Sequence, residues 1–199
     1  MRSTLTLVTA PVLEPVSLDE VKSHLRLDSD SAEEDAYLTI LRQVARETVE
    51  AHTRRALLTQ TWDWKLDGFP CAQPWELPKA PLQSVTSISY VDSDGATQTW
   101  ASSNYSVLAP AGPRAMPGTV ALAYNATYPV VRSIPNAVTV RFVAGWTAAA
   151  SVPAPIRHAV LILVAEMYAR REEAIVGTII NRVPVGVSHL LQNSCVPGW

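Results

Sequence analysis

The hydrophobic pattern of this chain changes period twice, and that change limits the folds open to it. Between residues 18 and 54 apolar side chains recur at helical spacing. Between residues 58 and 143 several segments alternate apolar with polar residues, which is the pattern of half-buried strands. After Pro155 the pattern is helical again. Helices, then strands, then a helix predict an α+β fold.

Two capping-box sequences predict where the first helices begin. Ser17-Leu-Asp-Glu20 places a hydroxyl and a carboxylate at capping spacing, and predicts a short helix from about Leu18 to Leu25. Ser31-Ala-Glu-Glu34 has the same spacing and predicts a long second helix. The apolar face expected on that second helix comprises Tyr37, Leu38, Leu41, Val44, Ala45, Thr48 and Val49.

The middle of the chain predicts antiparallel strands. Leu58–Leu66 alternates, with Trp62 and Trp64 on its apolar face. Asp92-Ser-Asp-Gly95 separates two strand-like segments and predicts a hairpin in which Gly95 takes a positive φ. The other strands expected are Trp75–Leu77, Val85–Val91, Thr97–Trp100, Tyr105–Leu108, Thr119–Ala123 and Ala137–Val143.

The last third of the chain holds one strongly apolar helix and one irregular segment. The helix is expected from about Ile156 to Glu173, and its entirely apolar stretch Ala159–Ala165 indicates a central helix covered on most sides. The segment after it, Ala174–Trp199, is apolar and interrupted by glycine and proline. Two interpretations remain open for this segment: a loop packed on its own core, or an arm lying on a neighbouring subunit.

The simplest arrangement packs the N-terminal and C-terminal helices together, with the antiparallel β region inserted between them. We therefore assign residues 15–56 and 153–175 to a helical core and residues 57–148 to an inserted β region. Residues 176–199 are assigned to an extended C-terminal arm.

The composition favours assembly over nucleic-acid or membrane binding. Charged residues make up only 17% of the chain and the net charge is −2, so part of the surface is poor in polar groups, as subunit contacts often are. Lys and Arg are scattered, unlike the clustered cations that bind phosphate backbones. No apolar run approaches the roughly 20 residues of a membrane span. The cysteines, Cys71 and Cys195, are expected to be free thiols in a reducing cytoplasm.

No common catalytic or cofactor-binding pattern occurs, so we expect neither an enzyme nor a bound metal or cofactor. The four histidines lack metal-ligand spacing, and there is no phosphate-binding glycine loop. Asp28-Ser-Asp-Ser31 resembles the start of a calcium loop, but Ala32 and Glu33 replace a ligand and the required glycine. The tryptophans of the β region suggest a carbohydrate-binding platform, although burial in the β core explains them more simply.

Six segments in order carry a family resemblance. They are Ser17-Leu-Asp-Glu-Val-Lys-Ser-His-Leu-Arg26, Glu33-Glu-Asp35, Arg55-Ala-Leu-Leu-Thr-Gln-Thr-Trp62, Leu77-Pro-Lys-Ala-Pro-Leu-Gln-Ser-Val-Thr-Ser-Ile88, Arg141-Phe-Val-Ala-Gly-Trp146 and Val152-Pro-Ala-Pro-Ile-Arg-His-Ala-Val160. Together they resemble the phage head–tail connector (adaptor, or head-completion) family of long-tailed phages and gene transfer agents. The resemblance covers most of residues 12–175.

The resemblance implies a structural adaptor that forms a ring, commonly of twelve subunits, beneath the portal. Such a ring extends the DNA channel and joins the head to the stopper or tail. The implied partners are other copies of the chain, the portal protein and a stopper or tail-completion protein. DNA passes through the lumen without sequence-specific binding. The implied location is the virion neck, after assembly in the host bacterial cytoplasm. The alternative hypothesis is a carbohydrate-binding module of a phage tail.

The apolar C-terminal segment and the helix end before it are the expected sites of subunit or portal contact. The residues predicted for this interface are Arg170, Arg171, Ile175, Val176, Ile179, Ile180 and Trp199.

Overall fold

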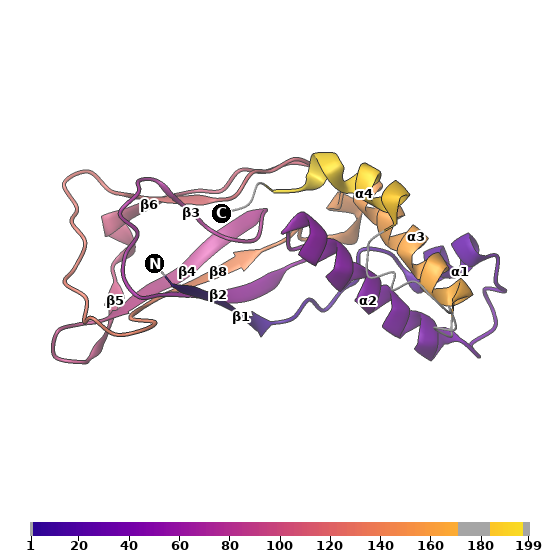
Figure 1. Ribbon diagram of the computed structural model, residues 1–199, viewed down its shortest axis with the longest axis horizontal. Helices are drawn as coiled ribbons and strands as arrows, with labels where there is room; N and C mark the ends of the chain where they lie inside the picture. The colour runs from indigo at the N-terminus through magenta and orange to yellow at the C-terminus, as the bar shows by residue number, and fades with distance from the viewer. Residues whose placement is uncertain (1, 171–183, 197–199) are drawn as a thin grey trace, which may run out of the picture.

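The computed structural model of this chain describes residues 2–170 and 184–196, and has helices at one end and strands at the other (Figure 1). The α+β class predicted from the sequence is confirmed. The helices are α1 (Leu18–Leu25), α2 (Asp35–Thr53), α3 (Ala154–Ala169) and α4 (Val185–Leu191). Short 3-10 turns occupy Ser102–Asn104, Ala149–Ser151 and Gln192–Ser194.

The two predicted capping boxes have different outcomes. At α1 the box is present: the Ser17 hydroxyl accepts from the Glu20 N–H at 3.0 Å, and the Glu20 carboxylate accepts from the Ser17 N–H at 2.7 Å. The prediction of a second box at Ser31 is wrong, because α2 begins at Asp35 and its N-cap makes no side-chain hydrogen bond. The Ser31 carbonyl instead accepts from the Lys22 ammonium, which holds that residue in a loop before the helix.

The helical part is built around α3. This helix contacts α1, α2 and α4, and none of the side chains from Ala159 to Ala165 is exposed, so the predicted central position is confirmed. The buried face of α2 is narrower than expected, because Val44 is 42% exposed. The residues of α2 that do enter this core are Leu38, Leu41, Ala45 and Val49.

The described C-terminal residues pack on their own chain. In α4, Val187 and Leu191 are fully buried in the helical core. Residues 184–196 therefore follow the first of the two interpretations that the sequence left open. The side chains of Val187 and Leu191 bury against the helical core, which offers them the same removal from water as a partner subunit would. The rest of the segment, residues 174–183 and 197–199, lies outside the described residues, as does the expected end of the preceding helix at residues 171–173.

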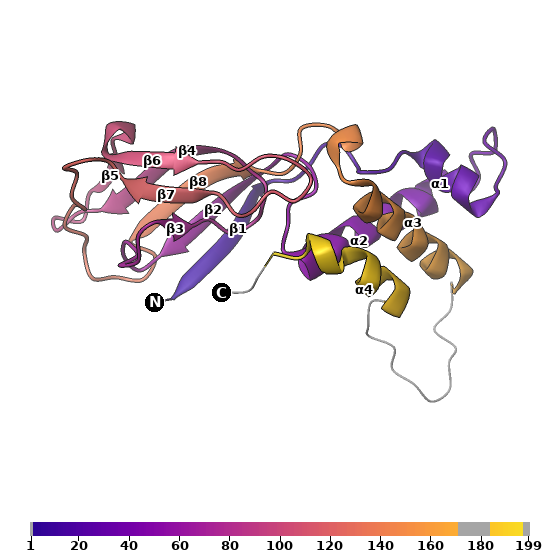
Figure 2. The same cartoon turned by 90° about the horizontal axis from the view of Figure 1, so that it is seen from above.

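The β region consists of two antiparallel sheets that lie face to face (Figure 2). The larger sheet has the strand order β1-β2-β8-β4-β5, and the smaller has the order β3-β7-β6. The strands are β1 (Ser3–Thr9), β2 (Gln60–Leu66), β3 (Trp75–Glu76), β4 (Leu82–Val91), β5 (Thr97–Trp100), β6 (Tyr105–Leu108), β7 (Thr119–Leu122) and β8 (Val138–Ala144).

Strand β1 was not anticipated from the sequence. Ser3–Thr9 pairs antiparallel with β2, so the first residues of the chain join the β region although two helices come between them. The alternation of Thr4, Leu5, Thr6 and Leu7 is a strand signal. It is too short to show which strand it would pair with, and that choice depends on a partner more than fifty residues away.

Tryptophans fill the space between the sheets and at the joint with the helices. Trp75, Trp100 and Trp146 are all less than 9% exposed. Trp62 and Trp64 are half-buried and pack against the β core. No row of exposed tryptophans exists within residues 2–170 and 184–196, and Trp199 lies outside those ranges. The geometry therefore favours core packing over the carbohydrate-binding hypothesis.

Two glycines are required by the backbone. Gly95 has a φ of 89° in the predicted hairpin turn, where the Asp92 carboxylate accepts from the N–H groups of Asp94 and Ala96. Gly145 has a φ of 107°, and a Cβ built there would lie 2.0 Å from the Leu58 carbonyl oxygen. A side chain at Gly145 would push apart the segment that enters β2 from α2 and the segment that leaves β8 toward α3.

The outer face of the larger sheet carries a cross-strand ion pair. Asp63 of β2 lies opposite Arg141 of β8, and the guanidinium donates to both carboxylate oxygens, at 2.7 and 2.8 Å. These hydrogen bonds lower the pKa of Asp63 from its ordinary value. The unfolded chain therefore takes up a proton at higher pH than the folded chain does.

We expect the Asp63 carboxylate to make the free energy of unfolding depend on pH in the acid range. Its contribution is present above the unfolded pKa of about 4 and is lost as the pH falls through the lowered folded value. Asp63→Asn should lower the melting temperature at pH 7 by a few degrees at most, because the partner Arg141 is partly exposed. Thermal melts of both proteins, recorded from pH 7 to pH 2, should give melting temperatures that converge at the acid end of the range. A constant difference between the two melting temperatures over this pH range would contradict a lowered pKa for Asp63.

Candidate assembly surfaces

The helical and β parts meet at the C-terminal end of α2, where Glu50 is buried. One carboxylate oxygen of Glu50 accepts from the Leu57 N–H at 2.7 Å and from the Gln60 side-chain amide at 2.6 Å. The other oxygen accepts from the Arg46 guanidinium at 2.9 Å. A single buried carboxylate therefore connects α2 to the segment that becomes β2.

The same cluster holds the linker between β1 and α1. Arg46 also donates to Glu14, with Nε 3.0 Å from a carboxylate oxygen. Burial raises the pKa of Glu14 from its ordinary value, and the Arg46 guanidinium opposes that shift. The carboxylates of Glu14 and Glu50 thus share one guanidinium, which the exposed Glu47 also contacts, and each buried charge has an opposite charge beside it, as low-dielectric sites require.

Arg55 connects the joint to the C-terminal segment. Its side chain is only 2% exposed. The Arg55 Nε donates to the Ser194 carbonyl at 2.5 Å, and one terminal nitrogen donates to the Ala115 carbonyl at 2.7 Å. The guanidinium also lies 5.9 Å from the centre of the Trp146 ring. Burial lowers the pKa of Arg55 from its ordinary value. The group stays charged at neutral pH, because an arginine guanidinium keeps its proton in folded proteins.

These contacts make the joint a fixed connection. Backbone hydrogen bonds add to it, including Ala56 N–H to the Ala80 carbonyl at 3.0 Å and Val196 N–H to the Thr53 carbonyl at 3.0 Å. A buried network with its polar groups satisfied holds one arrangement of the segments it connects. The chain therefore presents its helical end and its β end at a constant relative orientation.

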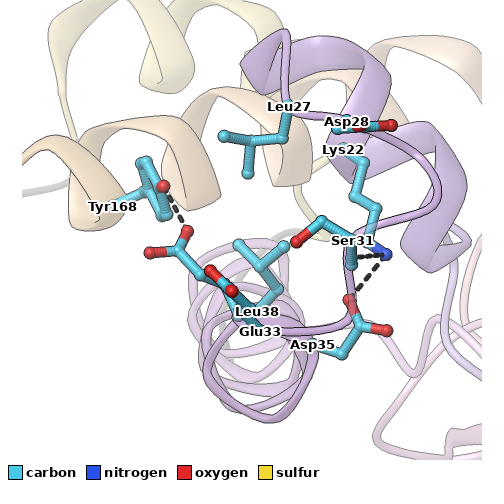
Figure 3. A pocket seen from close by; sticks show the side chains of 9 residues that line it. Lys22, Leu27, Asp28, Ser31, Glu33, Asp35, Leu38 and Tyr168 are labelled. Atoms are coloured by element: carbon cyan, nitrogen blue, oxygen red, sulfur yellow. Dashed lines mark hydrogen bonds and ion pairs between the residues drawn. The ribbon is translucent and has the colours of Figure 1, made fainter.

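A pocket lies at the far tip of the helical part, between α1, α3 and the loop before α2 (Figure 3). Lys22 is buried there, and its ammonium donates to the carbonyls of Ser29 and Ser31 and pairs with Asp35 at 2.6 Å. The Tyr168 hydroxyl donates to the Glu34 carboxylate. A side-chain ammonium therefore holds the loop that resembles a calcium site. Within the described ranges no cluster of His, Cys, Asp or Glu could hold a metal ion.

Only one of the residues predicted for the interface is described by the structure. Arg170 follows the last turn of α3, is exposed, and lies 3.5 Å from Glu166 in an ion pair. The others lie outside the described residues, and their role stays a prediction: Arg171, Ile175, Val176, Ile179, Ile180 and Trp199.

Exposed aliphatic side chains mark surfaces that the sequence analysis did not identify. In the linker after β1, Val12 is 95% and Leu13 is 56% exposed. On α2, Ile40 is 59% exposed and lies four residues from the exposed Val44. The exposure of Ile40 could have been predicted from the sequence, because this apolar residue falls outside the helical face that Leu38, Leu41 and Ala45 form. A further group lies on the β region, at Leu108, Tyr124 and Val130.

Comparison with known proteins identifies the class. Residues 15–103 match the sequence model of the phage gp6-like head-tail connector proteins. No curated protein matches the chain. The family is structural, so the chain is a structural protein and not an enzyme, and the resemblance inferred from its motifs is confirmed. Residues 15–103 are thus similar to the phage head–tail connector proteins, as the sequence motifs predicted.

Solved structures share the fold over nearly the whole chain. One, from the virion of a native gene transfer agent (GTA) particle, has a TM-score of 0.76 at 24% identity and covers 98% of this chain and 96% of that chain. A second, from the neck of an empty GTA particle with C6 symmetry, has 0.71 at 25% identity, covering 98% and 97%. A third, from the neck of a native GTA particle with C12 symmetry, has 0.69 at 20% identity, covering 98% and 97%.

In the described part of the chain, no helix combines the length and the apolar character that crossing a bilayer requires.

Proposed function

We propose that this chain is one subunit of a ring in the neck of a phage-like particle. The ring, of twelve copies, docks beneath the portal, extends the DNA channel and offers a platform to a stopper or tail-completion protein. The observation that carries this proposal is the likeness to a neck protein of a GTA particle over 98% of the chain, at 25% identity and a TM-score of 0.71. The proposed location is the virion neck, reached after assembly in the host cytoplasm.

The fixed joint supports this role. A subunit between a head and a tail must hold one binding surface at a set distance and angle from another. The clusters around Glu50 and Arg55 provide this by connecting the helical end to the β end through buried hydrogen bonds. The joint thus supports a role as a rigid spacer with a different neighbour at each end.

The state of the basic residues supports a channel through which DNA slides. Cations that grip DNA must reach phosphates from an exposed cluster. Many of the basic side chains here are instead engaged within the chain by carboxylates or carbonyls: Lys22, Arg46, Arg55, Arg141 and Arg157. With a net charge of −2 as well, the chain would hold DNA weakly and without sequence preference.

Removing the gene from a particle-producing cell tests the proposal. We expect packaged heads that leak DNA and lack tails, because the platform for the next neck protein is missing. Electron microscopy of the particles checks this result, and averaging of the intact neck counts the copies. Normal tailed particles in the absence of the chain would refute the proposal, as would a single copy in the intact neck.

The C-terminal residues predicted for the interface belong to this proposal. Arg170 is the member whose surroundings are known, and with its ion pair to Glu166 in place its side chain is 53% exposed and able to meet a partner. In the assembled particle, Arg170→Glu should reduce the number of tailed particles more than Arg170→Lys does, because only the first reverses the charge. Equal yields from the two variants would remove Arg170 from the interface.

A further inference from the structure

Two pairs of exposed aliphatic side chains lie on opposite sides of the helical part. The first pair is Val12 and Leu13 in the linker between β1 and α1, and the second is Ile40 and Val44 on α2. Single exposed aliphatic residues are ordinary on protein surfaces, whereas neighbouring ones form a continuous apolar surface that a partner can cover. Hereafter they are the linker pair and the α2 pair.

The positions of the two pairs follow from α2 and its hydrogen bonds. The Arg42 guanidinium donates to the Val16 carbonyl at 3.1 Å, and Arg46 donates to Glu14. The linker therefore runs along the side of α2 that carries these arginines. Each arginine comes two residues after a member of the α2 pair, which places it about 200° further round the helix. The linker pair and the α2 pair thus lie on nearly opposite flanks.

The views of the whole molecule agree with this placement. In Figure 2 the linker runs along one side of the helical part and α4 lies along the other. In Figure 1, α2 forms the lower edge of the helical part, below α3 and α4. The core-facing residues of α2 point toward α3, so no described helix covers its outer face.

From these positions we infer that the linker pair of one copy packs against the α2 pair of the next copy, in a head-to-tail contact that runs around the ring. This inference rests on the proposed function. Two different surfaces on opposite flanks of one chain can cover each other in a contact that repeats from copy to copy, and such a contact closes into a ring when the rotation permits. If two copies met through the same surface on each, the other pair of aliphatic side chains would stay exposed to water.

The charge and the area of these two surfaces fit a contact between two copies of the chain. Residues Ala10 to Leu13 carry no charge, and the exposed part of the α2 outer face carries only Glu47 among Ala36, Ile40, Gln43 and Val44. The two surfaces therefore meet without like-charge repulsion. Two aliphatic residues on each side form a contact far smaller than the roughly 1,600 Å² of a stable pairwise interface. Each copy in a closed ring gains two such contacts, so the ring is held together where a pair would separate.

Disulfide trapping in assembled particles tests the inference. The starting chain has Cys71→Ser and Cys195→Ser, and the test chain adds Val12→Cys and Ile40→Cys. Oxidation of purified particles should give a ladder of linked chains on a non-reducing gel, with peptide mapping showing joins between positions 12 and 40. Chains with only one of the two new cysteines should stay unlinked, because a head-to-tail contact brings no position next to its own copy.

Further variants make the result decisive. Leu13→Cys with Val44→Cys is a second trapping pair if the first assembles poorly, and Val130→Cys with Ile40→Cys is the matched control, since Val130 is 78% exposed on the distant β region. If particles contain the chain but show no disulfide between positions 12 and 40 or between positions 13 and 44, the inferred contact is refuted. The proposed function is then unaffected. Links between identical positions also overturn it. Particles that assemble without the chain refute the proposed function itself.

Discussion

Arg55→Ala is expected to lower the free energy of unfolding by about 3 kcal/mol, because two hydrogen bonds from a charged donor are lost and two buried carbonyls lose their partner. For a chain of this size such a loss corresponds to a melting temperature lower by about 6–12 °C. Trp146 lies beside the guanidinium, so tryptophan fluorescence during urea denaturation reports the change directly. The last residues should also exchange amide hydrogens faster, since Arg55 holds the Ser194 carbonyl.

The neighbouring arginine is the control for this prediction. Arg54 is exposed and has a φ of 58°, a conformation that asparagine tolerates better than most residues. Arg54→Asn should therefore change stability by less than about 0.5 kcal/mol. If Arg55→Ala proves no more harmful than Arg54→Asn, the proposed connection between α2 and the C-terminal segment does not stabilise the protein.

Glu50→Ala is expected to cost about 3 kcal/mol or more, since its removal leaves the Arg46 charge, the Leu57 N–H and the Gln60 amide without this acceptor in a buried site. The effect should be larger than that of a lost surface ion pair, because water cannot replace the carboxylate without entering the joint. Urea denaturation measures the loss. Hydrogen exchange should show faster opening at the start of β2, where the joint would loosen first.

Glu47→Ala is the matched control, because Glu47 lies on the same helix and its side chain is 56% exposed. Its pair with Arg46 is a surface contact, worth about 0.5 kcal/mol. A triple variant, Glu14→Leu with Arg46→Met and Glu50→Leu, removes the three paired charges together and should be less destabilising than Glu50→Ala, because none of these charges is left without its partner. A triple variant as unstable as the single one would show that packing, and not charge, accounts for the cost.

Local features of the sequence were enough to predict most of the elements. The Ser17 capping box, the hairpin turn at Gly95 and the apolar stretch in α3 all depend on residues within a few positions of one another. The same reasoning failed at Ser31, whose helix-capping pattern is overridden by the buried Lys22 from the preceding helix. Tertiary contacts of this kind are invisible to a search for local motifs.

The family assignment also came from the sequence, because the order of six short segments carries it across most of the chain, and the match over residues 15–103 confirms it. The predicted interface residues beyond Arg170 remain predictions.

What the sequence alone determined about this protein is its class, its order of helices and strands, and its structural character, since these follow from local spacing and composition. Only the tertiary structure decided which distant segments meet. Arg55 reaches a carbonyl 139 residues further along the chain, β1 finds its place beside β2, and the linker pair lies on the flank opposite to the α2 pair. Each of these depends on the burial of charge or apolar surface at a long-range contact, and that free energy depends on the whole fold and not on any one segment.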